Sequence, residues 1–360
     1  MSAKTGANTL GRGDSVTSPM TSDRPRYEPG TLGAATLRGR RSPQQSLAWS
    51  RIKRGAARQG ALFIGVAVIV AASGIAYDVA GGVNPLSSAL FWGPLALALG
   101  LAAALLRELS RNTVTSLSSL GKHRGYAVLG AAPELTDRAL RQLPPDQRTP
   151  LGCVAFQPAS NFATAFRDLQ SAMTEDRFVS FIAALPDEGA TTAALCTAVA
   201  AQQQGRSVVI VDCDIRRRSL TKSFGRNPDY GVLELCEQPD AWREVVEEEE
   251  ETGLHFLGAA RPRNPWRSII GSPGFGALMR NLRSEYDLVV LDCPPALASA
   301  EGPVVAAMAD KCVLVTAWDR TKLNSVRSAM RAVQRRQGLR TGVYVNRVPP
   351  QFRFGRLRPD

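Results

Sequence analysis

Residues 181–200 read FIAALPDEGATTAALCTAVA, which is an apolar stretch, a short turn and the first turns of a helix. This is the layout of a phosphate-binding loop, in which backbone N–H groups and a helix N-terminus hold the phosphates. The pattern GxxxxGKS/T, laid over residues 184–191, matches at Gly189 and Thr191. Alanine stands at positions 184 and 190, where the first glycine and the lysine belong. The stretch therefore predicts the backbone of a phosphate-binding loop without the lysine that normally neutralises the phosphates.

Apolar runs of strand length recur on both sides of this stretch, and helix-like segments separate most of them. The runs lie at residues 178–185, 207–212, 254–258, 288–292, 311–317 and 341–346, with a shorter one at 126–129. An amphipathic helix is predicted at residues 161–173. Continuous Val, Ile and Leu runs that alternate with helices indicate a mostly parallel sheet with helices on both faces. We therefore expect an α/β fold of the P-loop NTPase type.

Two segments nearer the N-terminus, residues 60–77 and 79–106, carry no charged side chain. Each is close to or above the ~20 apolar residues that a helix needs to cross a bilayer. Buried core helices and a cleaved signal peptide are the alternatives, but residues 89–106 show no polar stripe and about 60 mostly polar residues come first. Basic residues flank the pair while the short connection has none. We therefore expect a two-helix transmembrane hairpin with both termini in the cytoplasm.

The formal net charge of +12 is unevenly distributed, since eleven Lys or Arg and only three acidic residues fall in the first 60 positions. Residues 1–59, rich in Ser, Thr, Gly, Pro and Arg, are interpreted as a disordered basic cytosolic arm. Because a membrane hairpin follows it, the expected partner of the arm is anionic lipid, and nucleic acid is not expected. The remaining divisions are a hairpin at 60–106, a cytosolic linker at 107–159, an α/β domain at 160–348 and a basic tail at 349–360.

Neither the cysteines nor the histidines favour a metal centre. The six cysteines show no CxxC spacing, and only two histidines are present, so zinc sites and histidine-based triads are disfavoured. We interpret the cysteines as reduced, buried thiols. Similarly, Trp242, Trp266 and Trp318 are interpreted as packing residues, and the acidic run at 247–251 as a solvated face.

Acidic residues follow two of the predicted strands, at the edge where a parallel sheet binds its ligands. Asp212 and Asp214 come after one strand and Asp292 ends another, so the three carboxylates could hold Mg²⁺ and position an attacking hydroxyl. The alternative is that an aspartate after a strand only caps the next turn. The run Arg216, Arg217 and Arg218 could contact phosphate, although such runs are more often solvated.

The sequence around these residues resembles that of a family. VVIVDCDIRRRSL at 208–220 resembles the second Walker-type element, hhhDxDxR, of the bacterial tyrosine autokinases that serve capsule and exopolysaccharide export. YDLVVLDCPPA at 286–296 resembles their Walker B strand, GAARPRNPWRSIIGSP at 258–273 a Pro-Asn-Pro stretch, and GVYVNRV at 342–348 a late strand ending in Asn. GYAVLGAAP and NFATAFRDLQ resemble the entry to the same domain. These elements run in family order from about Gly125 to Val348.

The resemblance implies a P-loop kinase-like domain with ATP and Mg²⁺ as ligands. The implied cofactor-binding positions are Gly189, Ala190, Thr191, Thr192 and Arg216; the implied metal ligands are Thr191, Asp214 and Asp292; and the implied catalytic residues are Asp212, Asp214 and Asp292.

The chain also departs from the family pattern at several of its functional positions. Ala190 replaces the loop lysine, and Asp187 replaces a glycine, so we expect ATP and Mg²⁺ binding to be weak or lost. The assembly motif Glu-x-x-Arg-x-x-Arg reads Thr164, Arg167 and Gln170, and no tyrosine follows Tyr344. The chain therefore has the family's order of strand and loop motifs but lacks its loop lysine, most of its assembly motif and its C-terminal tyrosines.

The interpretation that follows is a kinase-like protein of the bacterial inner membrane in exopolysaccharide or capsule biosynthesis and export, with a degenerate ATP site and a regulatory or scaffolding role. Its expected partners are polysaccharide co-polymerase and export membrane proteins, and it could form a homo-oligomer. An active tyrosine kinase or ATPase, using an altered loop with an arginine from elsewhere or from a neighbouring subunit, is the first alternative. A membrane-tethered positioning ATPase is the second.

Overall fold

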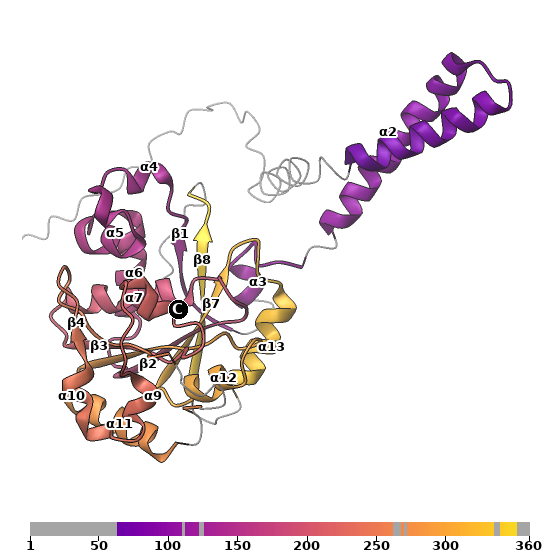
Figure 1. Ribbon diagram of the computed structural model, residues 1–360. Helices are drawn as coiled ribbons and strands as arrows, with labels where there is room; N and C mark the ends of the chain where they lie inside the picture. The colour runs from indigo at the N-terminus through magenta and orange to yellow at the C-terminus, as the bar shows by residue number, and fades with distance from the viewer. Residues whose placement is uncertain are drawn as a thin grey trace, which may run out of the picture. The chain divides into compact units, whose positions relative to one another are not determined.

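A computed structural model describes residues 63–109, 112–121, 126–261, 268–269, 272–334 and 339–350 (Figure 1). The chain divides into two compact units, one ending at Ala104 and the other beginning at Leu105. The basic arm at 1–59, most of the basic tail and Trp266 lie outside the described residues.

The first unit contains the apolar helix Phe63–Ala80 and most of a second one, α2 (Pro85–Leu109). Spans of 18 and 22 residues in them are long and apolar enough to cross a membrane, and they are only 6% and 11% buried. The helices approach closely at Gly74, where a Cβ atom would lie 2.1 Å from the Trp92 ring. Trp92 Nε1 also donates a hydrogen bond to Asp78 Oδ2 at 2.8 Å. The described residues thus form the expected hairpin, with its apolar side chains turned outward.

The second unit is built on an eight-stranded sheet with the strand order β1-β8-β7-β2-β6-β3-β5-β4. The strands are β1 (Ala127–Pro133), β2 (Phe178–Ala183), β3 (Val208–Asp212), β4 (Glu247–Glu248), β5 (His255–Leu257), β6 (Leu288–Asp292), β7 (Lys311–Ala317) and β8 (Arg340–Val348). All pairings are parallel except that of the edge strand β4 with β5. The predicted mostly parallel sheet is therefore confirmed, and each apolar run found in the sequence overlaps a strand.

Helices cover the sheet on both faces, and each face has its own apolar core. The helices are α3 (Ser118–Gly121), α4 (Asp137–Leu140), η1 (Pro145–Gln147), α5 (Pro150–Phe156), α6 (Asn161–Ser171), α7 (Ala190–Gln202), α8 (Ser219–Ser223), α9 (Val232–Leu235), η2 (Pro239–Ala241), α10 (Trp242–Val245), α11 (Pro273–Glu285), α12 (Glu301–Ala306) and α13 (Leu323–Val333). Helices α5, α6 and α7 pack on one face, and α9, α11, α12 and α13 on the other (Figure 1). Every residue of the central strands β2, β3 and β6 is buried, which explains their continuous apolar runs.

Much of the segment predicted as a linker, 107–159, packs into this unit. Strand β1 pairs in parallel with β8 and extends to Pro133, four residues beyond the predicted run. Near the start of the segment, Val114 N–H donates to the Thr321 carbonyl at 2.9 Å. The predicted amphipathic helix is α6, which buries Phe162, Phe166 and Leu169.

The interpretations of cysteine and tryptophan are confirmed for the described residues. All six cysteines are buried and free. Trp242 is buried against the core, and Trp318 is partly buried beside it. Within the acidic run, Glu247 and Glu248 form β4, so this segment also adds an edge strand to the sheet while Glu248 stays exposed.

Candidate nucleotide site

The loop between β2 and α7 has the geometry that the sequence predicts. Gly189 is the N-cap residue of α7, with φ +97° and no side-chain cap on the first N–H groups. Ala190 is the first helical residue, and Thr191 and Thr192 follow it, half-buried, in the first turn. Since the first N–H groups of a helix have no partner within the helix, an uncapped start of this 13-residue helix favours an anion.

Glu188 stabilises the loop through two hydrogen bonds. Its side chain is buried, and its carboxylate accepts hydrogen bonds from Leu185 N–H (3.0 Å) and from the Thr321 hydroxyl (2.5 Å). Burial raises the pKa of Glu188, and these hydrogen bonds oppose the rise. Thr321 belongs to the turn between β7 and α13, so Glu188 links the loop to the turn that follows the neighbouring strand β7. Sequence reasoning gave Glu188 no role, and no spacing signal links it to a threonine 133 residues away.

Asp187, which stands where the family has glycine, is exposed and adopts φ +63°. Its carboxylate pairs with Arg217, with Oδ1 3.1 Å from Nη2. Its carbonyl oxygen accepts a hydrogen bond from Arg320 Nη1 at 3.3 Å. The loop therefore has no lysine, but it is contacted by two arginines that lie far from it in the sequence.

Asp212 and Asp214 organise the turn after β3. Asp212 Oδ2 accepts hydrogen bonds from the N–H (2.9 Å) and hydroxyl (2.7 Å) of Thr221, and its Oδ1 accepts one from Asp214 N–H (3.1 Å). Asp214 Oδ1 in turn accepts a hydrogen bond from Arg217 N–H at 3.0 Å. Burial raises the pKa of Asp212 to about 6 and that of Asp214 above its usual value. Both carboxylates are thus engaged by backbone groups, as the capping alternative anticipated.

Asp292, at the end of β6, is different. It lies opposite Asp212 in the parallel register and is 1% exposed. Neither of its carboxylate oxygens has a hydrogen-bond partner of normal geometry among the described residues. Burial and, secondly, the charge of Asp212 raise the pKa of Asp292 well above its usual value, while the nearby Thr191 hydroxyl favours the ionised form. A buried carboxylate without a partner indicates a site for a proton or a cation.

The residues fit a magnesium ion only in part. No group of three His, Cys, Asp or Glu side chains within the described ranges is placed to hold a metal. Mg²⁺ at phosphate sites usually takes one or two protein ligands, phosphate oxygens and water. Thr191 and Asp292 can supply two such ligands. Arg216 is directed elsewhere, with Nη2 3.8 Å from Glu301 Oε1 of α12.

A separate hollow of about 450 Å³ lies near the amino ends of β3 and β5, at the sheet edge opposite the loop. Its lining residues are Ser207, Trp242, Arg243, Val246, Glu247, Glu248, His255, Glu285 and Tyr286. None of the predicted site residues lines it, so the candidate nucleotide site is defined by the loop and not by this cavity.

No protein-family model matches the chain. Among curated proteins it is 28% identical over 277 residues to EpsB of Ralstonia solanacearum, a candidate tyrosine-protein kinase. The match covers 73% of this chain and 36% of EpsB. It is 28% identical over 204 residues to the succinoglycan biosynthesis transport protein ExoP of Rhizobium meliloti, covering 54% of this chain and 26% of that protein. The chain thus spans about a third or less of the length of these two relatives.

Solved structures show the same fold. The kinase domain of the Escherichia coli tyrosine kinase ETK superposes with a TM-score of 0.59 and 21% identity, covering 69% of this chain and all of that domain. The chimerical protein CapA2B2 superposes with a TM-score of 0.56 and 22% identity, covering 65% of this chain and all of that one. The resemblance found in the sequence is confirmed: the homologues are bacterial tyrosine kinases of exopolysaccharide biosynthesis, and the fold is that of their kinase domains.

Proposed function

We propose that this homologue of bacterial tyrosine kinases is a membrane-anchored, kinase-like protein of exopolysaccharide or capsule biosynthesis and export, which regulates or scaffolds its partners and does not transfer phosphate. The observation that carries the proposal is Ala190, the first residue of α7, at the position of the loop lysine. No lysine occurs between Lys122 and Lys222. A charge-assisted contact is worth about 1.5–3 kcal/mol, so its loss weakens binding about 10- to 100-fold. Phosphoryl transfer loses more, because it depends on stabilising charge in the transition state.

The other site residues support retained nucleotide recognition. In this proposal the N–H groups that follow Gly189 bind phosphate, with Thr192 in the same helical turn and Arg216 at the margin of the site. Thr191 and Asp292 ligate Mg²⁺, with Asp214 beside them, and a bound Mg²⁺ would neutralise phosphate charge. Asp212 holds the turn that positions Asp214, through the hydrogen bonds already described.

Phosphoryl transfer by the full-length protein in detergent tests this function. We expect no ATP hydrolysis or autophosphorylation above the level of the Asp292→Ala variant. Ala190→Lys is expected to bind Mg²⁺ATP about 10- to 100-fold more tightly in calorimetry, because it returns the missing cation. Gln204→Lys, which adds the same charge just beyond the far end of α7, is the matched control and should change nothing. Turnover by the native chain that Asp292→Ala abolishes would restore the active-kinase alternative.

The hairpin leads to a proposal on location. Two apolar helices joined by a short turn support an inner-membrane anchor with both ends in the cytoplasm and the turn outside. The segment between the helices is too short to form an external domain. We therefore propose that polysaccharide co-polymerase or export proteins of the membrane supply the external part, that the chain can form homo-oligomers, and that the basic arm lies on anionic lipid.

Alkaline phosphatase, which is active only outside the cytoplasm, tests this topology in cells. Inserted at Gly82, in the turn between the two helices, the reporter is expected to be active. Fused after Pro350, in place of the basic tail, it is expected to be inactive. A reporter that is inactive at Gly82, in a chain still found in the membrane fraction, would contradict the proposed topology.

A further inference from the structure

Two arginines approach the phosphate loop from opposite sides of β2. Arg217 follows β3, and its Nη2 lies 3.1 Å from Asp187 Oδ1. Arg320 follows β7, and its Nη1 donates to the Asp187 carbonyl at 3.3 Å. Strand β7 is the immediate neighbour of β2 on one side, and β3 lies beyond β6 on the other. The strand order therefore brings two cations to the loop that has no lysine.

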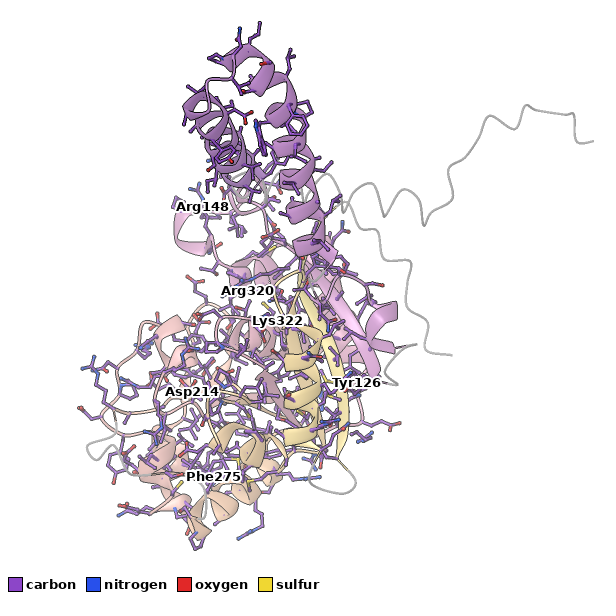
Figure 2. The ribbon with its side chains drawn as sticks, turned by 90° about the vertical axis from the view of Figure 1, so that its right-hand side faces the viewer. Tyr126, Arg148, Asp214, Phe275, Arg320 and Lys322 are labelled. Atoms are coloured by element: carbon purple, nitrogen blue, oxygen red, sulfur yellow. The ribbon has the colours of Figure 1, made fainter. Side chains whose placement is uncertain are left out.

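The backbone at both arginines is fixed by hydrogen bonds. Arg217 N–H donates to Asp214 Oδ1 at 3.0 Å, so a site aspartate fixes the backbone position from which the Arg217 side chain extends. The turn that carries Arg320 is closed by Thr321 N–H to the Ala317 carbonyl (3.1 Å) and by Ala317 N–H to the Thr321 hydroxyl (2.9 Å). The same hydroxyl binds Glu188 of the loop. Figure 2 labels Arg320 and Lys322 on this turn and Asp214 on the turn after β3.

We propose that Arg217 and Arg320 together replace the missing loop lysine and hold the outer phosphates of a nucleoside di- or triphosphate. This inference rests on the proposed nucleotide site and deepens it. A planar guanidinium donates two parallel hydrogen bonds to a phosphate, which suits it to this role.

The present partners of the two arginines are easily displaced. The Arg217–Asp187 pair is exposed, with side-chain exposures of 41% and 67%, and pairs of this kind contribute little to stability. Arg320 binds a neutral carbonyl oxygen of the loop. A polyphosphate carries several negative charges and competes with both partners. Asp187 is then an internal competitor for Arg217, so two cations beside the loop are compatible with the weak nucleotide binding expected from the sequence.

Calorimetry on the full-length protein in detergent, with Mg²⁺ADP, a non-hydrolysable ATP analogue and AMP as probes, tests the inference. Arg217→Ala and Arg320→Ala are each expected to weaken binding of the ATP analogue about 10-fold, and the double variant about 100-fold. AMP, which lacks the outer phosphates, should bind equally to all variants. Arg243→Ala, at the opposite edge of the sheet, is the matched control. Arg217→Gln and Arg320→Gln, checked by thermal melting, separate a lost contact from a misfolded loop.

Asp187→Asn gives a second, independent readout. Asparagine tolerates φ +63° but removes the competing charge, so this variant should bind the ATP analogue several-fold more tightly. This gain in affinity should vanish when Arg217→Ala is added, because Asp187 then has no arginine side chain to withhold from the phosphates. Absence of binding by the native chain at millimolar nucleotide, or arginine variants that bind as the native chain does, would overturn this inference but leave the scaffold function intact. Phosphate transfer by the native chain would overturn the scaffold function instead.

Discussion

Replacing Asp292 with asparagine is expected to raise the free energy of unfolding of the α/β unit at pH 7 by about 1–3 kcal/mol. The carboxylate is 1% exposed, has no hydrogen-bond partner of normal geometry among the described residues and lies opposite a second buried carboxylate, Asp212. A neutral amide of the same shape removes the cost of burying that charge. The same change should abolish stabilisation by Mg²⁺ together with nucleotide, because an amide oxygen is a much poorer ligand than a carboxylate.

The destabilisation by the buried Asp292 carboxylate should depend on pH. Burial raises the folded-state pKa of Asp292 well above its usual value and that of Asp212 to about 6, so the folded state holds these protons more tightly than the unfolded state does. Their contribution to stability is complete below the unfolded pKa of about 4 and is lost as the pH rises through the folded values. The native chain should therefore lose stability from about pH 4 to beyond pH 6.

Urea unfolding between pH 4 and 8, followed by tryptophan fluorescence, measures this slope. Asp292→Asn should flatten it, and Asp229→Asn, at an exposed position, should leave it unchanged. Equal slopes in all three chains would show that Asp292 is ionised and satisfied in the folded state. Addition of Mg²⁺ and nucleotide should restore stability at high pH to the native chain but not to the Asp292→Asn variant.

Asp292 therefore destabilises the fold unless it holds a proton or a cation. A site that only preserved the fold would be better served by an uncharged side chain here. The buried carboxylate supports cation binding at this position, even though Ala190 weakens the loop beside it. Both residues agree with the proposed function, in which Mg²⁺ and nucleotide are still bound but phosphate is not transferred.

The fold could be predicted from the sequence because its central strands are buried on both faces. Such strands appear as uninterrupted apolar runs, as at Leu288–Asp292, and each ends where a ligand-binding edge was expected. Strand β1 was predicted too short, at residues 126–129. Its Gly130, with φ +148°, lies at a register shift, and the second half of the strand, Gly-Ala-Ala-Pro, has no β-branched or aromatic residue to mark it as a strand in the sequence.

The contacts that complete the site could not be predicted in the same way. Glu188 meets Thr321, and Asp187 meets Arg320, across 133 residues in each case. These contacts depend on β7 lying next to β2, which is a property of strand order and not of local pattern. The sequence likewise indicated the three aspartates but not that Asp212 accepts hydrogen bonds from Thr221 while Asp292 has no partner of normal geometry among the described residues.

Gly189→Ala is expected to cost about 3 kcal/mol of stability and to abolish nucleotide binding. Part of the cost, about 1–2 kcal/mol, is the strain of an L-residue at φ +97°. The rest comes from Asn346, whose Nδ2 would lie 2.1 Å from the new Cβ atom. Asn346 is buried, and it donates to the Glu188 carbonyl at 3.4 Å and accepts from Arg347 N–H at 2.9 Å. It therefore cannot move without disturbing the loop.

Gly205→Ala separates the two contributions, because Gly205 has φ +83° and no atom lies within 4 Å of the place that its Cβ would take. Denaturant unfolding should give about 1–2 kcal/mol for this control, so the difference between the two variants measures the contact with Asn346. Adding Asn346→Ala to Gly189→Ala should recover part of that difference, since it removes the obstructing amide. If both glycine variants lower the free energy of unfolding equally, the loop can accommodate a Cβ atom at position 189. The close approach of Asn346 in β8 to the phosphate loop would then not constrain the site.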